Sequence, residues 1–437
     1  DHRAGLYVFG QNRHRDAYDH DGDGYSEMPK LKNQTVGFRS FLKTSTYSKL
    51  TFEYHHLQEF RRGGNMLNRP PHEADIAEQI QHSINGGGLK FDYFAPNEKH
   101  RLTLYTSAQH TDRDSYYGSK KDLNAYGKTT DLTFIGGSQY VYSFDKCLFM
   151  PADLTAGLEY NRDNLKDDMW GYNRYTRQTV NIGSAFFQNE WKNEKWSILL
   201  GGRLDKHNLI NHVIFSPRAN LRFNPTQDVN LRLSYSSGFR APQAFDEDLH
   251  IENVGGTVSM IERAKNLKEE KSQSFSASAD MYHRFGAFQV NFLVEGFYTK
   301  LSDVFVLENI GVRDGILIKE RRNGSGAKVL GLSMEGKMAY LSLFQLQAGV
   351  TLQQSRYDEP EKWSETAPAQ KKIFRTPNTY GYFTATYTPV KPLSVSLSGT
   401  YTGSMLVQHM AGYIKNDIAV NTRDFFDMGV KLAYDFK

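Results

Sequence analysis

The stretch Val229-Asn-Leu-Arg-Leu-Ser-Tyr235 alternates apolar and polar side chains at every second position. The same pattern recurs in Leu393-Ser-Val-Ser-Leu-Ser-Gly399 and in Phe426-Asp-Met-Gly-Val-Lys-Leu-Ala-Tyr-Asp-Phe436. Because successive side chains of a β-strand point to opposite faces, a period of two predicts strands with one apolar and one polar face. Such strands suit a barrel with lipid outside and water inside, although a soluble β-sandwich alternates too.

Composition favours strands over helices. The 437 residues include 26 Tyr and 28 Phe but 13 Pro, a balance typical of half-buried pleated surfaces. Mean hydropathy is −0.60, and no run approaches the roughly 20 consecutive apolar residues that a spanning helix requires. If the chain crosses a membrane, we expect it to cross with strands.

Charge and cysteine content exclude several function classes. The formal net charge of +4 is mixed in sign along the chain, so nothing indicates a nucleic-acid partner. The single cysteine, Cys147, has no partner for an internal disulfide and belongs to no zinc-binding spacing.

The connections between the alternating segments show a second periodicity. Short turns are predicted at 44–49, 96–99, 192–195, 224–228, 284–287, 340–343 and 388–392, and a somewhat longer one at 144–152. Between them, long polar stretches fall at 16–33, 60–77, 112–128, 163–177, 242–269, 357–376 and 407–424, with a brief one at 207–211. Bacterial barrels alternate short periplasmic turns with long extracellular loops. The sequence therefore predicts one all-β domain over 1–437, an antiparallel up-and-down transmembrane barrel of about 18 strands, and shows no internal repeat of the propeller kind.

Two boxes resemble a known family. The stretch Leu233-Ser-Tyr-Ser-Ser-Gly-Phe-Arg-Ala-Pro242, a long connection, and then Asn266-Leu-Lys-Glu-Glu-Lys-Ser-Gln-Ser-Phe275 are similar to the late barrel of TonB-dependent outer-membrane receptors. Phe239, Arg240, Ala241 and Pro242 form the first box, and Asn266 and Leu267 open the second. Lys265 before Asn266, and Glu269 where the family commonly has Pro, depart from the pattern.

Further resemblance lies in Phe60-Arg-Arg-Gly-Gly64, in Arg375-Thr-Pro-Asn378 and in Phe425 to Lys437, so that it covers nearly the whole chain. The resemblance implies a barrel of about 22 strands, with two expected before Asp1 and two after Lys437. It also implies an N-terminal plug domain, absent from this chain, that meets the TonB complex. Arg240 and the polar strand faces are expected to point into the lumen toward that plug.

The implied function is uptake of a scarce, bulky nutrient across the bacterial outer membrane. The cargo expected from the resemblance is an iron–siderophore, haem or cobalamin, bound in extracellular loops, with membrane lipid and a surface lipoprotein as further partners. Nothing indicates an enzyme, because the sequence has no nucleophile elbow, P-loop or H-E-x-x-H run. Two alternatives remain open: a passive porin-like channel of 18 strands, and a surface adhesin or assembly barrel.

An acidic segment resembles the start of a calcium-binding loop. Asp19-His-Asp-Gly-Asp-Gly-Tyr-Ser-Glu27 places Asp19, Asp21 and Asp23 at alternate positions with Glu27 as a further oxygen donor. The twelfth position is Lys30 rather than the Glu of an EF-hand, so the alternative is a solvated acidic loop. No other cofactor is expected.

Cargo binding has candidate residues in the long loops. His250 lies between the two boxes, where haem receptors resembling this arrangement carry an axial histidine. Its possible partners are His72, His207, His212 and His409; the alternative is an ordinary surface histidine. Aromatic and Arg side chains that could hold a planar or anionic chelate include Tyr116, Tyr117, Trp170, Tyr172, Tyr175 and Trp363 with Arg61, Arg62, Arg174 and Arg177. Those nearest strand ends are alternatively membrane-interface aromatics.

Overall fold

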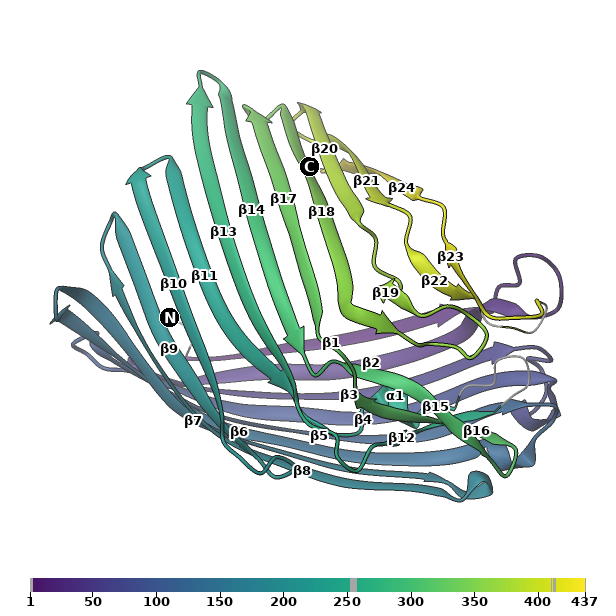
Figure 1. Ribbon diagram of the computed structural model, residues 1–437. Helices are drawn as coiled ribbons and strands as arrows, with labels where there is room; N and C mark the ends of the chain where they lie inside the picture. Colours follow the sequence, from purple (N-terminus) through teal and green to yellow (C-terminus); the bar gives the residue numbers. More distant parts are fainter. Residues whose placement is uncertain (1–2, 252–257, 410, 412–413, 437) are drawn as a thin grey trace.

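A computed structural model describes residues 3–251, 258–409, 411 and 414–436 of the chain. One antiparallel sheet of 19 strands dominates it (Figure 1). Apart from the three-residue β19 (Gln370–Lys372), the strands of this sheet pair with one another in chain order and are called the wall strands. Their number confirms the prediction of about 18. These wall strands are β1 (Ala4–Arg15), β2 (Ser26–Ser45), β3 (Ser48–Gly64), β4 (Ile76–Phe94), β5 (His100–Ser119), β6 (Tyr126–Cys147), β7 (Met150–Met169), β8 (Arg174–Lys192), β9 (Trp196–His207), β10 (Ile214–Thr226), β11 (Val229–Arg240), β13 (Glu270–Phe285), β14 (Phe288–Ser302), β17 (Ala327–Tyr340), β18 (Phe344–Glu361), β20 (Thr379–Val390), β21 (Leu393–Thr402) and β24 (Phe425–Tyr434).

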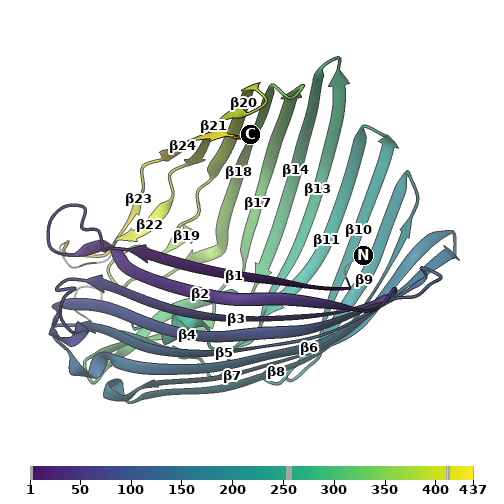
Figure 2. The ribbon, with the colours of Figure 1, turned by 180° about the vertical axis from the view of Figure 1, so that it is seen from behind.

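The wall curves around a central space without closing. Figure 2, seen from behind, shows β1 to β8 on the side opposite to β10 to β18. Within the described residues, β1 pairs with β2 alone and β24 with β21 alone. Tight hairpins join the wall strands at one end, and the long connections gather at the other, as the alternation of lengths predicted. The end with the long connections is called the loop end below, and the other the turn end.

The strands run further into the loop end than the sequence predicted. The polar stretch 112–128 was predicted as a connection, but β5 continues to Ser119 and β6 begins at Tyr126. Likewise β7 and β8 leave four residues between them where 163–177 was predicted. Strand ends that rise above the bilayer lose the apolar face that marks the membrane-spanning part. At the turn end, 144–152 reduces to the two residues between β6 and β7.

One long connection was not predicted at all. Residues 303–326 join β14 to β17 and contain a hairpin of β15 (Phe305–Arg313) and β16 (Ile316–Asn323). Asp314 and Gly315 form its turn with φ angles of 51° and 80°, the left-handed values of a type I′ hairpin. The two short strands are themselves extended, so no clear polar interruption marks this connection in the sequence.

Smaller elements fill the loop end. They are η1 (Pro71–Glu73), η2 (Leu123–Ala125), η3 (Trp170–Tyr172), α1 (Asp246–Leu249), β12 (Ser259–Arg263), β22 (Leu406–His409) and β23 (Ile418–Asn421). β12 pairs in parallel with β16, which makes a three-stranded loop sheet in the order β12-β16-β15. Among the described residues no helix has the length and apolar character to cross a membrane.

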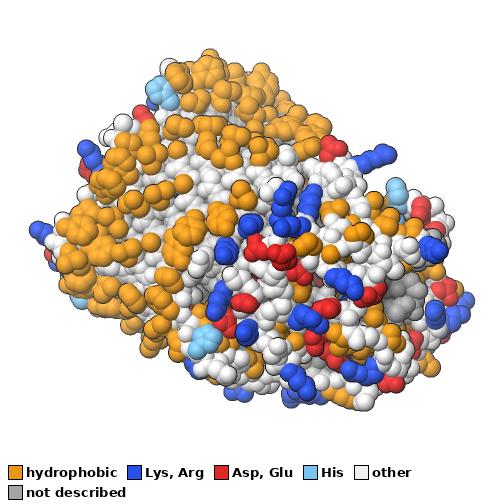
Figure 3. Space-filling model, in the orientation of Figure 1, with side chains coloured by type: hydrophobic (Ala, Val, Ile, Leu, Met, Phe, Trp, Pro, Cys, Tyr) orange, Lys and Arg blue, Asp and Glu red, His pale blue; other side chains and the backbone are white. Residues whose placement is uncertain are grey.

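The outer surface of the wall is apolar toward the turn end. In the orientation of Figure 3, hydrophobic side chains cover the part of the surface formed by β9 to β18, while charged side chains collect toward the loop end. Many large hydrophobic side chains are exposed there, among them Leu200, Leu233, Phe275 and Phe292. An exposed apolar band of this kind matches a lipid-facing barrel wall.

Candidate functional site at the loop end

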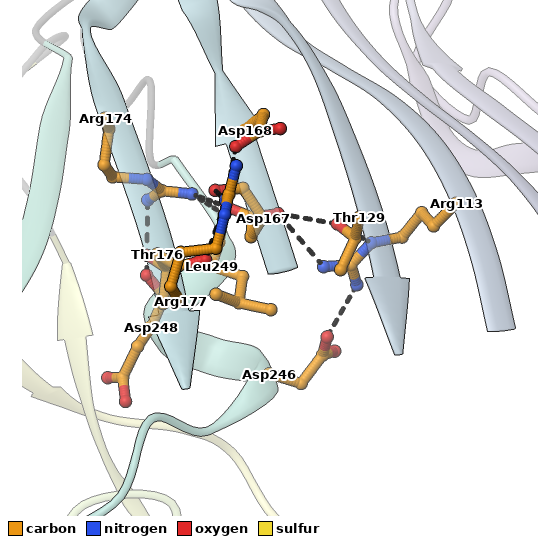
Figure 4. Close-up of polar contacts among 10 residues, drawn as sticks. All are labelled: Arg113, Thr129, Asp167, Asp168, Arg174, Thr176, Arg177, Asp246, Asp248 and Leu249. Atoms are coloured by element: carbon orange, nitrogen blue, oxygen red, sulfur yellow. Dashed lines mark hydrogen bonds and ion pairs between the residues drawn. The ribbon is translucent and has the colours of Figure 1, made fainter. Parts of the chain in front are cut away.

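Asp167, near the loop end of β7, is the centre of a buried polar network (Figure 4). Its side chain is almost fully enclosed and accepts hydrogen bonds from Thr129 Oγ1 and from an Nη atom of Arg174, both at 2.6 Å. Arg113 on β5 donates to Thr129 Oγ1 at 3.1 Å and lies 4.0 Å from Asp167. A buried carboxylate requires such partners, because an isolated charge in a low-dielectric site is very costly.

The network holds α1 against the inner face of β5 to β8. Arg113 forms an ion pair with Asp246 at 2.6 Å, and Arg174 donates to the backbone carbonyls of Asp248 and Leu249 at 3.3 and 2.8 Å. Leu249 packs against Leu165 in a small buried cluster. The connection that follows β11 therefore folds into the mouth of the barrel instead of extending into solvent.

A second buried ion pair joins two connections to each other. Arg321 on β16 is 4% exposed and donates through Nε and an Nη atom to Asp248 Oδ1, at 2.9 and 2.6 Å. Its guanidinium also reaches Glu247 at 2.9 Å. Together with the pairing of β12 and β16, this links the 241–269 connection to the 303–326 connection.

The first sequence box lies where the chain leaves β11 and turns into the mouth of the barrel. Arg240 is on the polar face of β11, and its guanidinium carbon stacks 3.8 Å from the ring centre of Phe245 and 5.5 Å from that of Phe305. Ala241 is buried beside Ile210 and Ile214. Arg240 thus packs on its own connection through Phe245 and on the 303–326 connection through Phe305. The second box, with Asn266 and Leu267, precedes β13, which begins at Glu270.

A cavity of about 620 Å³ opens between the loop end of β8, α1 and β12. Four cationic side chains line it, against two carboxylates, those of Asp248 and Glu262. The four are Arg174, Arg177, Arg263 and Lys265. Arg263 donates to Gln178 Oε1 at 2.7 Å and to the carbonyl of Pro242 at 3.4 Å, both neutral acceptors. Arg174 and Arg177 are paired with Asp167 and Asp168 behind the lining, at 2.6 and 2.5 Å, so the positive charge that attracts anions comes mainly from Arg263 and Lys265.

The sequence had singled out part of this lining. Arg174 and Arg177 were predicted as ligand contacts, and the structure places both at the cavity. Arg263, Arg113, Asp167 and Arg321 were not predicted, because nothing in a long polar stretch distinguishes a buried charge from a solvated one. The run Arg263-Ala264-Lys265 directly before Asn266 was the available signal.

His250 lies at the edge of the docked segment. It is half-buried, and its ring packs 4.4 Å from that of Tyr117 on β5, centre to centre. The residue after it, Ile251, is buried with Tyr117 and Met169. Of the described residues, neither His72 nor His409 is in contact with this ring pair.

His72 and Tyr116 belong to a separate cluster. His72 in η1 shares a 2.7 Å hydrogen bond with the hydroxyl of Tyr126, whose ring packs on Tyr116. Tyr116 and Tyr117 are neighbours on β5 and point to opposite faces of the wall. His72 and His250 are therefore separated by the sheet, and the structure does not bring them together as a pair of ligands.

The other histidines have individual surroundings. His207 is fully buried, with Nδ1 accepting from the amide of Leu209 at 3.0 Å and Nε2 at 3.3 Å from Gln243. His212 is 3.1 Å from Glu269. His409 is exposed at the end of β22.

The aromatic residues of η3 divide into two kinds. Trp170 is exposed, whereas Tyr172 is half-buried and donates to Asp122 at 2.6 Å. Burial and this hydrogen bond to Asp122 hold the pKa of Tyr172 well above its usual value of 10.0. Tyr172 thus ties η3 to η2, while Trp170 is free to meet a solute.

The acidic segment between β1 and β2 brings its carboxylates together. One oxygen from each of Asp19, Asp21, Asp23 and Glu27 lies within 4.8 Å of the others, and all four side chains are exposed. Asp19 also accepts hydrogen bonds from the amides of Gly22 and Gly24 at 2.7 and 2.9 Å. Hard divalent cations such as Ca²⁺ prefer oxygen ligands arranged in this way.

The curved antiparallel wall, its apolar outer band and the loops folded into its mouth define a β-barrel protein of the bacterial outer membrane. Residues 5–437 match the profile of the family described as "TonB dependent receptor-like, beta-barrel", and the chain belongs to this family. It is therefore a TonB-dependent receptor barrel, a transporter component and not an enzyme. No curated protein sequence matches the chain.

Solved structures share the fold. The siderophore receptor PirA from Acinetobacter baumannii superposes with a TM-score of 0.78 at 14% identity, over 99% of this chain and 69% of that one. A mutant of the ferric enterobactin receptor PfeA from Pseudomonas aeruginosa gives 0.78 at 14% identity, over 100% and 69%. The ferric-catecholate import receptor Fiu from E. coli gives 0.67 at 12% identity, over 99% and 71%.

Proposed function

We propose that the cargo of this receptor is an anionic iron–siderophore complex that binds in the cavity lined by Arg174, Arg177, Arg263 and Lys265. The single observation that carries the proposal is the excess of cationic over acidic side chains in that lining. A ferric chelate with several ionised oxygens carries negative charge, and Arg pairs with such oxygens through geometrically matched N–H donors. The structural neighbours named as siderophore receptors support the same class of cargo.

The nearby Trp170 and Tyr175 add aromatic surface to the same region. Both side chains are more than half exposed, on η3 and at the start of β8. Aromatic faces can stack on the planar rings of a catecholate or a similar chelating group. Recognition would thus combine charge from the cavity with stacking at its rim.

Haem is the second candidate, and His250 favours it. An imidazole is an ordinary axial ligand of haem iron. Its ring already packs on Tyr117, however, so haem would have to displace this contact or use the exposed ring edge. Cobalamin finds no specific support among the described residues.

Binding assays on the full-length receptor test these alternatives. Quenching of Trp fluorescence would be titrated with a tris-catecholate iron complex, a neutral hydroxamate iron complex, haemin and cobalamin. We expect the anionic iron complex to bind most tightly, and Arg263→Gln/Lys265→Gln to weaken it by roughly tenfold or more through loss of two charge-assisted contacts. Lys120→Gln/Lys121→Gln, a matched loss of two exposed charges elsewhere at the loop end, should leave binding unchanged.

Tight binding of haemin that is abolished by His250→Ala would overturn the siderophore proposal in favour of haem. Equal binding of the anionic and neutral iron complexes would show that the cationic lining does not select cargo. Growth of a deletion strain on each compound as sole source provides the transport readout.

We also infer that the loop end faces the cell exterior, as it does in bacterial barrels generally. A cysteine at Asn124 in η2 would then react with a membrane-impermeant maleimide on intact cells, and one at Asn97 in a tight turn would not. Both variants are made with Cys147→Ser, because the native thiol is partly exposed. The reverse labelling pattern would refute this orientation.

Calcium binding by Asp19, Asp21, Asp23 and Glu27 is a separate proposal. The convergence of the four carboxylates supports it, because four like charges so close together repel one another unless a cation joins them. Calorimetric titration of the receptor with calcium should give binding heat that Asp21→Asn/Asp23→Asn abolishes. Heat that is absent, or that persists in this variant, would end the proposal.

A further inference from the structure

The outward face of β13, β14, β17 and β18 changes character along the strands. At the turn end, Phe285, Phe288, Tyr340 and Phe344 lie in register as one aromatic row. At the loop end of the same face, Lys300 pairs with Lys328, Lys328 with Arg356, and Arg356 with Lys372 of β19. These four residues are called the basic row. The same outward face therefore begins in aromatic and ends in cationic side chains.

The spacing of the two rows matches a bilayer. From Phe288 to Lys300 on β14 the strand advances about 40 Å, which is about 30 Å along the membrane normal at a tilt of about 40°. This is the thickness of the hydrocarbon core. The basic row is thus at one boundary between lipid tails and water.

Only one member of the basic row has an acidic partner among the described residues. Side chains directly opposite each other on neighbouring strands lie about 5 Å apart, so like charges there repel. Lys328 forms an ion pair with Asp358 at 3.2 Å. Within the described part of the chain, Lys300, Arg356 and Lys372 form no ion pair. Three of the four side chains, those of Lys300, Lys328 and Arg356, are exposed. Figure 3 shows Lys and Arg side chains gathered beside the hydrophobic surface.

An apolar groove of about 1100 Å³ lies directly beneath the row, on the side of the turn end. Tyr298 and Leu330 line it, and each lies two positions closer to the turn end than the lysine on the same face of its strand, Lys300 on β14 and Lys328 on β17. Its depth comes from small residues, Ala219, Ala277 and Gly296, set among larger ones. A side chain added at Gly296 would meet nothing within 4 Å, so this part of the wall is open to lipid.

We propose that the groove and the basic row together bind one phosphorylated, multiply acylated glycolipid of the outer leaflet. The acyl chains lie in the groove, and the phosphates meet the basic row. A cationic row continuous with an apolar groove matches a lipid with a highly anionic head group, since each basic side chain near a membrane surface favours anionic lipid. The choice of leaflet follows from the orientation proposed above, and the site is independent of the cargo cavity.

Native mass spectrometry of the full receptor in detergent tests the proposal by counting bound lipids. The probes are purified bisphosphorylated lipid A, phosphatidylglycerol and phosphatidylcholine. We expect one lipid A to bind in preference to both phospholipids. Lys300→Gln/Lys328→Gln/Arg356→Gln should weaken that binding by roughly tenfold or more, because three charges are lost. Lys120→Gln/Lys121→Gln/Arg313→Gln removes the same charge from exposed positions at the loop end and should have no effect.

The groove is tested by filling it. Gly296→Leu places a side chain in open space within the groove, and Gly336→Leu does the same on the outward face of β17 outside it. We expect the first to weaken lipid A binding and the second to leave it unchanged, with both proteins folded.

Equal retention of lipid A and phosphatidylglycerol would overturn the choice of ligand, and unchanged binding in the triple variant would overturn the site. Cargo binding measured on the same samples distinguishes these failures from a failure of the siderophore proposal. The labelling of Asn124 and Asn97 variants reports separately on orientation.

Discussion

The membrane-spanning part of β13, β14, β17 and β18 and the loop end of β5 to β8 are built from the same kind of strand, but different environments determine their side chains. In the first, one face is apolar and exposed, and the other is polar and faces the lumen. In the second, the lumen side is covered by α1, and charges such as Asp167 and Arg113 are buried. In the spanning part, contact with lipid determines at each outward position whether the side chain is apolar. At the loop end, the fold depends on contacts between residues that are far apart in the chain.

The largest effect is expected from removing the central charge of the loop end. Asp167→Ala leaves Arg113 and Arg174 buried without their carboxylate, which costs about 3–5 kcal/mol. Amide hydrogen exchange of residues 244–251 would measure this as a loss of protection of the docked α1 segment. Asp246→Ala removes a carboxylate that is 84% exposed and should cost less than about 1 kcal/mol. Equal effects of the two variants would contradict the role given to the network.

The spanning region is tested by adding a charge to one face or the other. Met334→Arg places the charge toward lipid in the middle of β17 and should cost about 2–4 kcal/mol of folding free energy in vesicles. Ser333→Arg, one residue earlier, points it into the lumen, where Ser333 now shares a hydrogen bond with Thr351. Urea unfolding of both variants would show whether the face, rather than the position along the strand, determines the cost.

Tyr172 provides a test by pH. Tyr172→Phe removes a hydrogen bond to a charged group and should weaken the docking of η3 on η2 by about 1.5–3 kcal/mol at neutral pH. Because the folded pKa of Tyr172 is raised, its stabilisation is complete below pH 10, the usual value, and declines as the pH rises above it. Hydrogen exchange at rising pH, corrected for the intrinsic rate, should show this decline in the native protein and a flatter profile in Tyr172→Phe.

The smallest effect concerns the first sequence box. Phe245→Leu keeps an apolar side chain but removes the ring on which Arg240 stacks at 3.8 Å, at a cost of about 0.5–2 kcal/mol. Limited proteolysis of the 241–251 segment would detect the loosening. No change in cleavage rate would mean that the turn is held without this ring, by the 3.3 Å ion pair of Arg240 with Glu247 and by its contact with Phe305.

The spanning wall was predictable from sequence because its signal is local. Alternation in stretches such as Val229 to Tyr235 records the two solvents on the two faces, and hairpin turns separate the strands. The two boxes indicated the family to which the wall belongs. The prediction erred where water lies on both faces, as in 112–128, because alternation disappears there while the strand continues.

The loop end was predictable only in part. Arg174 was recognised as a polar residue near aromatic ones, but its partners Asp167 and Asp248 come from β7 and from a connection more than 70 residues away. A single sequence does not record which of many charged residues meet. The same reason hid Arg321, which is in a hairpin that was not predicted.

The loop sheet also has an immunological consequence. Its adjacent strands β12 and β16 come from two different connections and are held side by side by parallel pairing. An antibody raised against the folded receptor at this surface would recognise a discontinuous epitope. Such an antibody would bind the native protein but not the denatured chain, and peptides copied from either stretch alone would compete poorly.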